Sequence, residues 1–105
     1  MRAGALDRRV TLQKRADGYD EAGQPIEGWE DVATVWGDVR FLSGLEAVKS
    51  GLQVSVAKAS IRIRYRTGLD SGMQATCDGF VFAINAVLPD ISRREYVDLV
   101  CEVVS

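Results

Sequence analysis

The segment from Ile61 to Arg66 alternates strictly between apolar or aromatic side chains and arginines, in the order Ile-Arg-Ile-Arg-Tyr-Arg. A period of two is the period of a β-strand, in which successive side chains point to opposite faces of a sheet. One face of this predicted strand can be buried, and the other carries a row of positive charge about 13 Å long, at roughly 3.3 Å per residue. The buried set is Ile61, Ile63 and Tyr65, and the charged set is Arg62, Arg64 and Arg66. The chain must therefore form a sheet that gives its arginines a partner.

Alternating segments separated by turn signals recur along the chain. The other expected strands are Arg9–Lys14, Trp29–Leu42, Gln74–Cys77, Phe80–Val87 and Tyr96–Val104. Asp17–Gly28, rich in glycine and acidic residues, predicts an exposed hairpin loop, and Asp78-Gly79 predicts a tight hairpin turn. About six strands with closely spaced turns predict a mainly all-β fold, as a single domain over residues 1–105. A small antiparallel β-barrel or closed sandwich is expected, because closure removes exposed sheet edges.

Apolar positions of the strands are expected to fill one core. They are Val10, Leu12, Val32, Val35, Val39, Phe41, Val97, Leu99, Cys101 and Val103. Both faces of Phe80–Val87 are apolar, and alternation places Ala86 with Phe82 on one face and Val87 on the other. The two cysteines, Cys77 and Cys101, are expected to be small buried thiols rather than a disulfide.

Three residues of the second predicted strand carry separate expectations. Trp36 is expected in the core. Trp29 follows the acidic loop, so it is either a core residue, which we favour, or an exposed interface aromatic. Gly37 in mid-strand indicates a bulge or the close approach of another backbone.

A break in the alternation follows this strand. Ser43-Gly44-Leu45-Glu46 fits a capping box, and Leu45, Val48 and Leu52 follow at helical spacing. One short helix is therefore expected in a long connection between two strands, weakened or ended at Gly51. Gln53–Ser60, which follows, either begins the arginine strand or forms a flexible arm.

Composition argues against several classes of function. The 105 residues include 13 basic and 15 acidic residues, a formal net charge of −2, which is unusual for a general nucleic-acid binder. There is no histidine, so the commonest general base and metal ligand is absent, and we expect no enzyme, metal or cofactor. No apolar run approaches the roughly 20 residues of a membrane helix, and the N-terminus lacks the apolar region of a signal peptide. We therefore expect a protein made in a cytoplasm, without a membrane partner.

Several motifs, taken in order, resemble the phage head–tail joining proteins, also called head-closure or stopper proteins. Leu6-Asp7-Arg8-Arg9-Val10-Thr11-Leu12-Gln13 is similar to the family's opening strand, and Ser43-Gly44-Leu45-Glu46 is similar to its S-G-x-E motif. Further likenesses are Gly23 with Trp29, Val35-Trp36-Gly37-Asp38-Val39, Ile61–Gly68, Asp78–Ile84 and Leu99–Glu102. One departure is Gly37, where the family usually has alanine after the tryptophan.

The resemblance implies a small β-barrel that is monomeric when free and forms a homo-oligomeric ring in the virion. Such a ring lies under the portal and adaptor connector proteins, closes the DNA exit of the head and docks the tail completion protein. The packaged DNA would contact it at most non-specifically, and assembly would take place in the cytoplasm of the bacterial host.

The resemblance also implies that the connection from Ser43 to Ala59 projects into the channel and can form a gate. Its candidate gate or channel residues are Ser43, Gly44, Leu45, Glu46, Val48, Lys49, Leu52, Val54 and Val56. The alternative is a helical crossover whose apolar face covers one end of the barrel.

The partner of the arginine row stays open between three alternatives. The first is pairing across the sheet with acidic residues such as Asp98 and Glu102. The second is contact with neighbouring subunits or the adaptor ring, for which the planar guanidinium is well suited, and the third is DNA phosphate. The candidate subunit or adaptor contacts are Arg62, Arg64, Arg66 and Trp29.

A different class of function is a free-standing small β-barrel that binds a peptide or an oligonucleotide. Such a module is expected to interleave exposed aromatic and basic residues on one face. In this sequence only Tyr65 lies near the arginines, and it points to the opposite side of the strand. The sequence therefore favours the connector protein.

Overall fold

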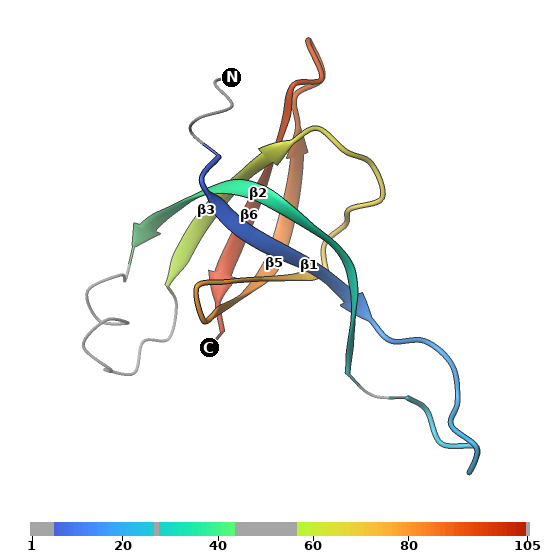
Figure 1. The fold of residues 1–105 in the computed structure, drawn as a ribbon. Coiled ribbons are helices and arrows are strands. Elements are labelled where there is room, and N and C mark those ends of the chain that lie inside the picture. The colour runs from blue at the N-terminus through green and yellow to red at the C-terminus, as the bar shows by residue number, and fades with distance from the viewer. Residues whose placement is uncertain (1–5, 27, 44–56, 105) are drawn as a thin grey trace.

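The six alternating segments form one closed antiparallel barrel in the computed structural model (Figure 1). The structure describes residues 6–26, 28–43 and 57–104. The strands are β1 (Arg8–Arg15), β2 (Trp29–Ser43), β3 (Lys58–Arg64), β4 (Gln74–Cys77), β5 (Phe80–Pro89) and β6 (Tyr96–Val103). They pair in the order β1-β2-β3-β6-β5-β4, and pairing of β4 with β1 closes the barrel. The predicted fold class is confirmed.

The described residues are strands, turns and loops, and they contain no helix that could cross a membrane. The predicted short helix, from Ser43 through Leu52, falls almost entirely outside the described residues. The same holds for residues 53–56 of the predicted strand or arm, whereas Lys58, Ala59 and Ser60 begin β3. β3 ends at Arg64, so Tyr65 and Arg66 lie just beyond the strand in which we expected them.

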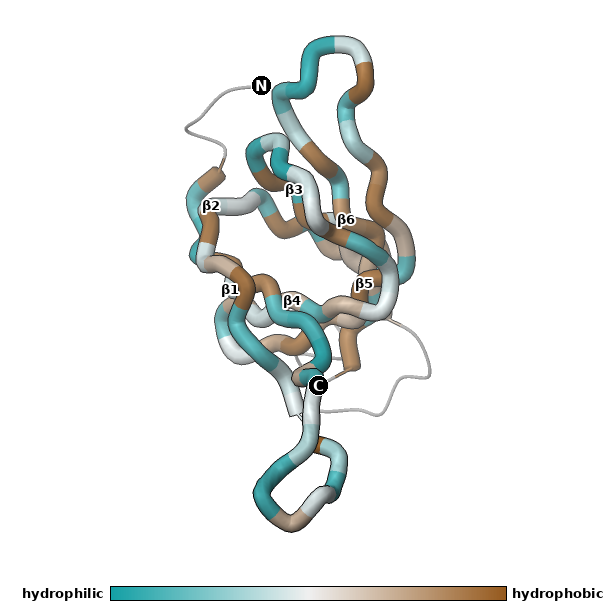
Figure 2. The backbone as a smooth tube through the Cα atoms, turned by 90° about the vertical axis from the view of Figure 1, so that its right-hand side faces the viewer, coloured by the Kyte–Doolittle hydropathy of each residue, from teal (hydrophilic) through white to brown (hydrophobic). Residues whose placement is uncertain are grey.

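The inward side chains of all six strands form one apolar core. Residues that are fully buried in it include Val10, Leu12, Ile61, Ile63, Phe82, Val97, Leu99 and Cys101. Hydrophobic and hydrophilic positions alternate along the strands that ring this core (Figure 2). Three phenylalanine rings pack together in the core, with Phe41 lying 5.4 Å from Phe80 and 5.9 Å from Phe82 between ring centroids.

The phase of β2 places Trp36 outside the barrel, so its predicted core position is wrong. Val35, Val39 and Phe41 pack against the core, and the alternation that turns them inward turns Trp36 outward, where its side chain is 50% exposed. Val32 is also exposed rather than buried. Gly37 lies between Val35 and Val39 in the alternation and is buried. A Cβ at this position would lie 3.3 Å from the carbonyl oxygen of Arg62 on β3, which confirms the predicted close approach of another backbone.

The expected placement of Ala86 on the face of Phe82, with Val87 on the other face, is wrong because β5 contains a β-bulge. The register shifts between Ile84 and Ala86, so Val87 lies opposite the buried Leu99 and packs against the core. The extra residue, Asn85, is exposed, and it changes which residues of the following segment face inward. Strict alternation fails here because both faces of this strand are apolar and the sequence alone cannot reveal the shift.

The hairpin turn between β4 and β5 forms at Asp78-Gly79, as the sequence predicted. Cys77 and Phe80 are paired on either side of it, and both turn residues have positive φ angles, 51° at Asp78 and 84° at Gly79. Aspartate and glycine tolerate this conformation better than most residues, which is why the dipeptide favours a two-residue turn.

The two cysteines are free, buried thiols. Burial raises the pKa of the Cys101 thiol from 9.0 to about 12, so the folded state favours the protonated form. This contribution to stability is complete below pH 9 and is lost as the pH rises towards 12.

We therefore expect the free energy of unfolding of the wild type to fall by about 1 kcal/mol more than that of Cys101→Ala between pH 9.5 and 10.5. Urea unfolding in reducing buffer at both pH values measures this difference, with Cys77→Ala as a companion variant. The pKa of Cys77 is also raised, mainly by burial and in part by Asp78, while nearby Arg8 opposes the shift. Parallel pH profiles for the wild type and Cys101→Ala would contradict the assignment.

Candidate interaction surfaces

Arg62 is held within its own barrel by a two-point contact with Asp98. The two residues lie directly opposite each other on β3 and β6, and Nε and one terminal nitrogen of Arg62 donate to the two carboxylate oxygens at 2.8 and 2.9 Å. The guanidinium also lies 3.8 Å from the centroid of the Tyr96 ring. The hydrogen bonds to Asp98 raise the pKa of Arg62 further above its ordinary value, against the effect of burial. Cross-strand pairing is therefore confirmed for Arg62.

This pair is expected to stabilise the folded chain. A double-mutant cycle of Arg62→Gln and Asp98→Asn should give a coupling free energy of about 1 kcal/mol, because the bidentate geometry is favourable but the side chains are 41% and 23% exposed. Urea unfolding of the four proteins measures it. The matched control is the cycle of Arg40→Gln and Asp38→Asn, in which the arginine is 76% exposed and a smaller coupling is expected. Equal couplings for the two pairs would contradict the expectation.

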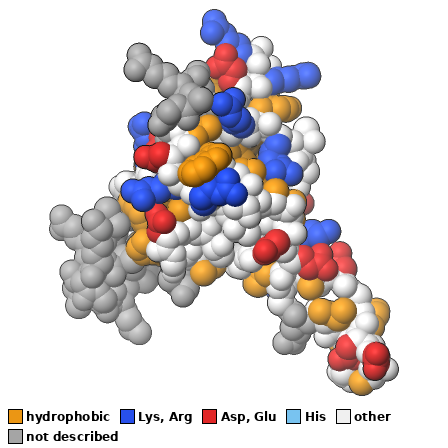
Figure 3. Space-filling view, viewed as in Figure 1, with side chains coloured by type: hydrophobic (Ala, Val, Ile, Leu, Met, Phe, Trp, Pro, Cys, Tyr) orange, Lys and Arg blue, Asp and Glu red, His pale blue; other side chains and the backbone are white. Residues whose placement is uncertain are grey.

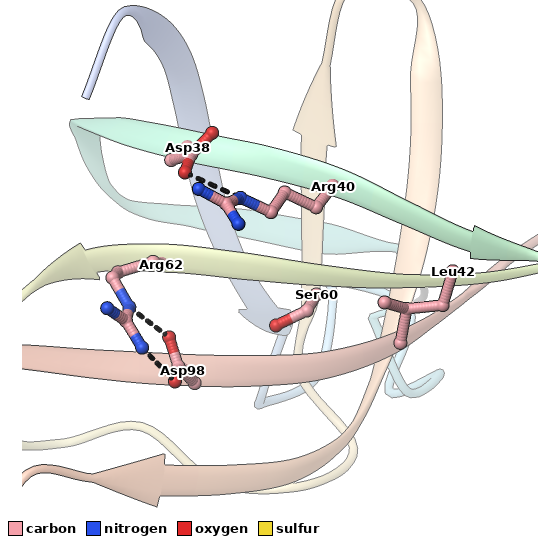
Figure 4. Close-up of a pocket in the computed structure, with 6 residues that line it drawn as sticks. All are labelled: Asp38, Arg40, Leu42, Ser60, Arg62 and Asp98. Atoms are coloured by element: carbon pink, nitrogen blue, oxygen red, sulfur yellow. Dashed lines mark hydrogen bonds and ion pairs between the residues drawn. The ribbon is translucent and has the colours of Figure 1, made fainter. Parts of the chain in front are cut away.

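A hollow on the outer face of β2, β3 and β6 is lined by charges that neutralise one another (Figure 4). Arg40 of β2 donates to Asp38 of the same strand at 3.0 Å, and Arg62 of β3 binds Asp98 of β6. Two arginines thus meet two aspartates, and no positive charge is left over for a phosphate. Glu102, which we also expected to pair with an arginine of the Arg62–Arg66 row, instead lies opposite Lys58 where β3 pairs with β6.

Arg64 differs from Arg62 because no described acidic residue forms an ion pair with it. It is exposed at the end of β3, and no ion pair joins it to another residue within the described ranges. Three adjoining hollows meet at its side chain, and their walls include Trp36, Arg66 and Arg94. The predicted row of three equivalent arginines is therefore broken after Arg62.

Around Arg64 the barrel presents a basic and aromatic surface. Arg9 lies over the half-exposed Trp36 ring at 4.8 Å from its centroid, and Nε of Arg66 is buried without a hydrogen-bond partner in the described part of the chain. Asp7 and Glu95 are the acidic residues that line these hollows. We call this the arginine–tryptophan surface; its members are Arg9, Trp36, Arg64, Arg66 and Arg94. Figure 3 shows basic and hydrophobic side chains together over the upper part of the barrel.

The connection between β1 and β2 projects from the barrel as a hairpin (Figures 1 and 2). Backbone hydrogen bonds, such as Ala16 N–H to Gly28 O at 3.0 Å and Ile26 N–H to Gly18 O at 3.0 Å, continue the pairing beyond the barrel. The turn at its tip is held by Asp20, whose carboxylate accepts from the N–H groups of Ala22 and Gln24, both at 2.9 Å. The exposed hairpin loop that we predicted is confirmed.

This hairpin is acidic and carries exposed apolar side chains. Residues 16–28 include four acidic residues and no basic residue. Tyr19 is 74% exposed and Ile26 is 43% exposed, and Figure 3 shows acidic and hydrophobic side chains together at this tip. We call residues 16–28 the acidic hairpin.

Trp29 lies at the base of the acidic hairpin, 37% exposed, so of the two placements considered the exposed one is correct. The guanidinium of Arg15, directly opposite on β1, lies 5.1 Å from its ring centroid. Trp29 is therefore far from the arginines of β3, because Arg62 pairs with Asp38, nine positions further along β2.

The sequence missed the exposed aromatic residues that lie beside arginines. Trp36, Trp29 and Tyr96 each have a guanidinium over the ring, so the expectation that no aromatic interleaves with basic residues is wrong. The signal was available for Trp36, because the alternation through Val35, Gly37 and Val39 already places it outward. Arginines of the same chain cover these rings, which makes them less accessible for stacking with nucleotide bases.

The candidate gate residues after Ser43 lie outside the described residues, as do Leu45, Val48 and Leu52 of the predicted helix. The structure fixes the two ends of this connection. Ser43 pairs with Lys58, so β2 ends beside the start of β3 at one end of the barrel.

The described part of the chain offers no cluster of residues suited to a metal ion, since no group of three histidine, cysteine or carboxylate side chains comes together there. What it presents are two surfaces of opposite charge, the arginine–tryptophan surface and the acidic hairpin.

A family model and a curated relative indicate the same family. A family model described as phage head completion protein matches residues 1–104. Head completion protein gp7 of Enterobacteria phage HK97 is 28% identical over 71 residues, which are 68% of this chain and 63% of that protein, less than two thirds of its length. The solution structure of protein SF1141 from Shigella flexneri 2a aligns with a TM-score of 0.74 and 30% identity, covering 98% of this chain and 96% of the other. A chain in the virion of a native gene transfer agent particle has the same fold, with a TM-score of 0.66, 22% identity and coverage of 94% and 96%.

Proposed function

The chain belongs to the phage head completion protein family, and we propose that it completes the connector between the head and the tail of a phage. In this proposal, copies of the chain form a ring under the portal and adaptor proteins. The ring closes the DNA exit of the filled head and offers a docking face to the tail completion protein. The observation that carries the proposal is the match of the family model to residues 1–104, a range that includes all six strands of the barrel.

The family is structural rather than enzymatic, and the surface of the barrel is suited to assembly. Its candidate contacts are the two oppositely charged surfaces, which project from different parts of the barrel. Of the contacts proposed from the sequence, Arg64, Arg66 and Trp29 remain candidates for neighbouring subunits or the adaptor. Arg62 is a weaker candidate, because Asp98 already occupies its guanidinium.

The connection between β2 and β3 is the proposed channel segment, with the candidate gate residues named from the sequence. The resemblance to stopper proteins supports this proposal, and the pairing of Ser43 with Lys58 places the described ends of the connection together at one end of the barrel. Amide hydrogen exchange of the free monomer tests it. Fast exchange between residues 44 and 56 is expected, and protection equal to that of β3 and β6 would count against a mobile gate.

Completion of heads in vitro tests the function itself. Heads that carry portal and adaptor, taken from a phage that lacks this gene, are incubated with the purified chain and then with tails. Added chain is expected to reduce DNA loss from the heads and to produce joined particles in electron micrographs. Ring-shaped density under the adaptor is expected in the same images.

Two results would overturn the proposal. The first is that heads without the chain retain DNA and join tails as well as heads with it, and the second is that the chain adds no density to the connector. Ovalbumin at the same concentration serves as the protein control. Binding of a peptide or oligonucleotide by the free chain, without any effect on heads, would support the free-standing module instead.

A further inference from the structure

We propose that the acidic hairpin of one copy binds the arginine–tryptophan surface of the next copy, and that this contact joins the subunits of the ring. The inference rests on the proposed function, because it names the contact that the ring would use. It follows from two surfaces of one chain that complement each other in charge and chemistry and cannot meet within that chain.

The acidic hairpin has the properties of an inserting element. It extends about 20 Å beyond the last barrel pair, Arg15 with Trp29, at roughly 3.3 Å per residue from Ala16 to Glu21. Its backbone is ordered by its own hydrogen bonds, so little conformational entropy remains to be lost on binding. Neither Asp17 nor Glu21 forms an ion pair with a described residue, and Tyr19 at the tip is largely exposed. Such a tip suits a basic surface that also offers an aromatic side chain.

The arginine–tryptophan surface has the complementary properties. Arg64 and Arg94 face a shared hollow, and Arg64 also shares walls with Trp36. Arg66 adds a guanidinium to the hollow that Arg64 and Trp36 line, and its buried Nε has no hydrogen-bond partner among the described residues. Arginine and tryptophan are the residues most often found at the energetic centre of protein interfaces, and arginine binds carboxylates in two-point fashion.

The two surfaces of one copy cannot reach each other. Arg9 begins the arginine–tryptophan surface at one end of β1, and the acidic hairpin leaves from the other end, six residues and about 20 Å away. The hairpin then continues away from the barrel, as Figure 1 shows. A contact between them must therefore join two copies head to tail, and such contacts close into rings when the rotation between copies is suitable.

A second copy fits this surface better than DNA does. The occupant would have to bring negative charge together with apolar side chains, and the acidic hairpin carries both. A DNA phosphate would bring charge alone, and the four carboxylates of the hairpin would repel a strand that approached the ring. The hairpin in turn requires a basic partner with aromatic character, which the arginine–tryptophan surface supplies.

Site-directed cross-linking tests the contact without removing any charge. Gln24→Cys at the hairpin tip and Thr67→Cys beside Arg66 are both at exposed positions, and the native cysteines are buried. Rings assembled on heads from this variant and treated with a short bismaleimide should give a ladder of cross-linked chains on a denaturing gel. The matched control pairs Gln24→Cys with Asn85→Cys on β5, three strands from β2 around the barrel, and should give no ladder.

Charge reversal gives an independent readout. Glu21→Lys and Arg64→Glu should each lower the yield of completed heads by about tenfold or more, because each places like charges in contact. Both changes in one chain should restore the yield to within about threefold of the wild type, since the pair is re-formed with opposite polarity. The matched control combines Glu21→Lys with Lys58→Glu and has the same net charge as this double variant. Lys58 lies at the opposite end of β3 from Arg64, so the control should not restore the yield. Circular dichroism of each monomer verifies folding.

The outcomes separate the inference from the proposed function. If wild-type chain completes heads but no ladder forms, or if the double reversal does not restore the yield, the inference is wrong and the function stands. Loss of tail docking with an unchanged ladder would assign the arginine–tryptophan surface to the tail or adaptor, and increased DNA loss with an unchanged ladder would assign it to DNA. Either result overturns the inference. If the wild-type chain fails to complete heads, the proposed function fails and the inference falls with it.

Discussion

Replacing Phe82 with alanine is expected to lower the free energy of unfolding by about 3–5 kcal/mol, the largest effect of any single truncation in this barrel. Phe82 is fully buried, and its ring centroid lies 5.9 Å from that of Phe41 and 6.1 Å from that of Phe80. The truncation removes the ring that both of these contact and leaves a cavity that rigid strands on all sides can fill only in part. Domains of this size are commonly stable by only about 5–15 kcal/mol, so the variant should be partly unfolded at 37 °C.

Urea unfolding followed by tryptophan fluorescence measures this change. The matched control is Leu88→Ala, on the same strand, where the side chain is 54% exposed. We expect that variant to stay within about 0.5 kcal/mol of the wild type. A loss below about 1 kcal/mol for Phe82→Ala would contradict the closed, tightly packed core.

Replacing Gly37 with valine is expected to lower the free energy of unfolding by about 2–3 kcal/mol through overpacking. A Cβ at this position would lie 3.0 Å from Cγ2 of Val10 on β1, and 3.3 Å from both the carbonyl oxygen of Arg62 and Cγ2 of Ile61 on β3. The side chain of Val10 can shift, but the carbonyl of Arg62 belongs to a strand paired on both sides. The two further methyl groups of valine therefore have to displace the backbone of β3.

Gly37→Ala separates overpacking from the conformational preference of glycine. Alanine gains about 0.5–1 kcal/mol over glycine in a strand because it loses less entropy on folding, and its single methyl group requires a shift of only a few tenths of an ångström. We expect these effects nearly to cancel. Equal stability of the alanine and valine variants in thermal unfolding would contradict the close approach.

The strands could be predicted from the sequence because the alternation of apolar and polar residues within a strand indicates which side chains face the core. The alternation in Ile61–Arg66 and in Tyr96–Val103 identified the buried residues, and Asp78-Gly79 located a turn that depends on two φ angles alone. Prediction failed at the bulge after Ile84, where neither face is polar and the register depends on the neighbouring strand β6. It also failed at Trp36, where the size and apolar character of the side chain were given more weight than its place in the alternation.

The candidate site was predicted only in part. Pairing of the arginine row with acidic residues such as Asp98 was one of three alternatives that the sequence left open, and the pairing of β3 with β6 shows it for Arg62. The sequence could not distinguish Arg64 from Arg62, because both arginines alternate with apolar or aromatic residues in the same segment. In the barrel Arg62 lies opposite Asp98, whereas Arg64 lies opposite Tyr96. The acidic hairpin was visible as a loop, but its extension away from the barrel depends on the continued pairing of its two arms.

The sequence by itself determined that this chain is all-β with a charged outer face, because strand period and turn chemistry are local properties. The absence of histidine, which argued against an enzyme or a metal site, is a property of composition. Only the tertiary structure decided which arginines are neutralised and which are left for a partner. That distinction depends on the order and register of strands far apart in the chain, with Arg62 and Asp98 separated by 36 positions. Closure of the barrel brings these residues together, and it also separates the arginine–tryptophan surface from the acidic hairpin of the same chain.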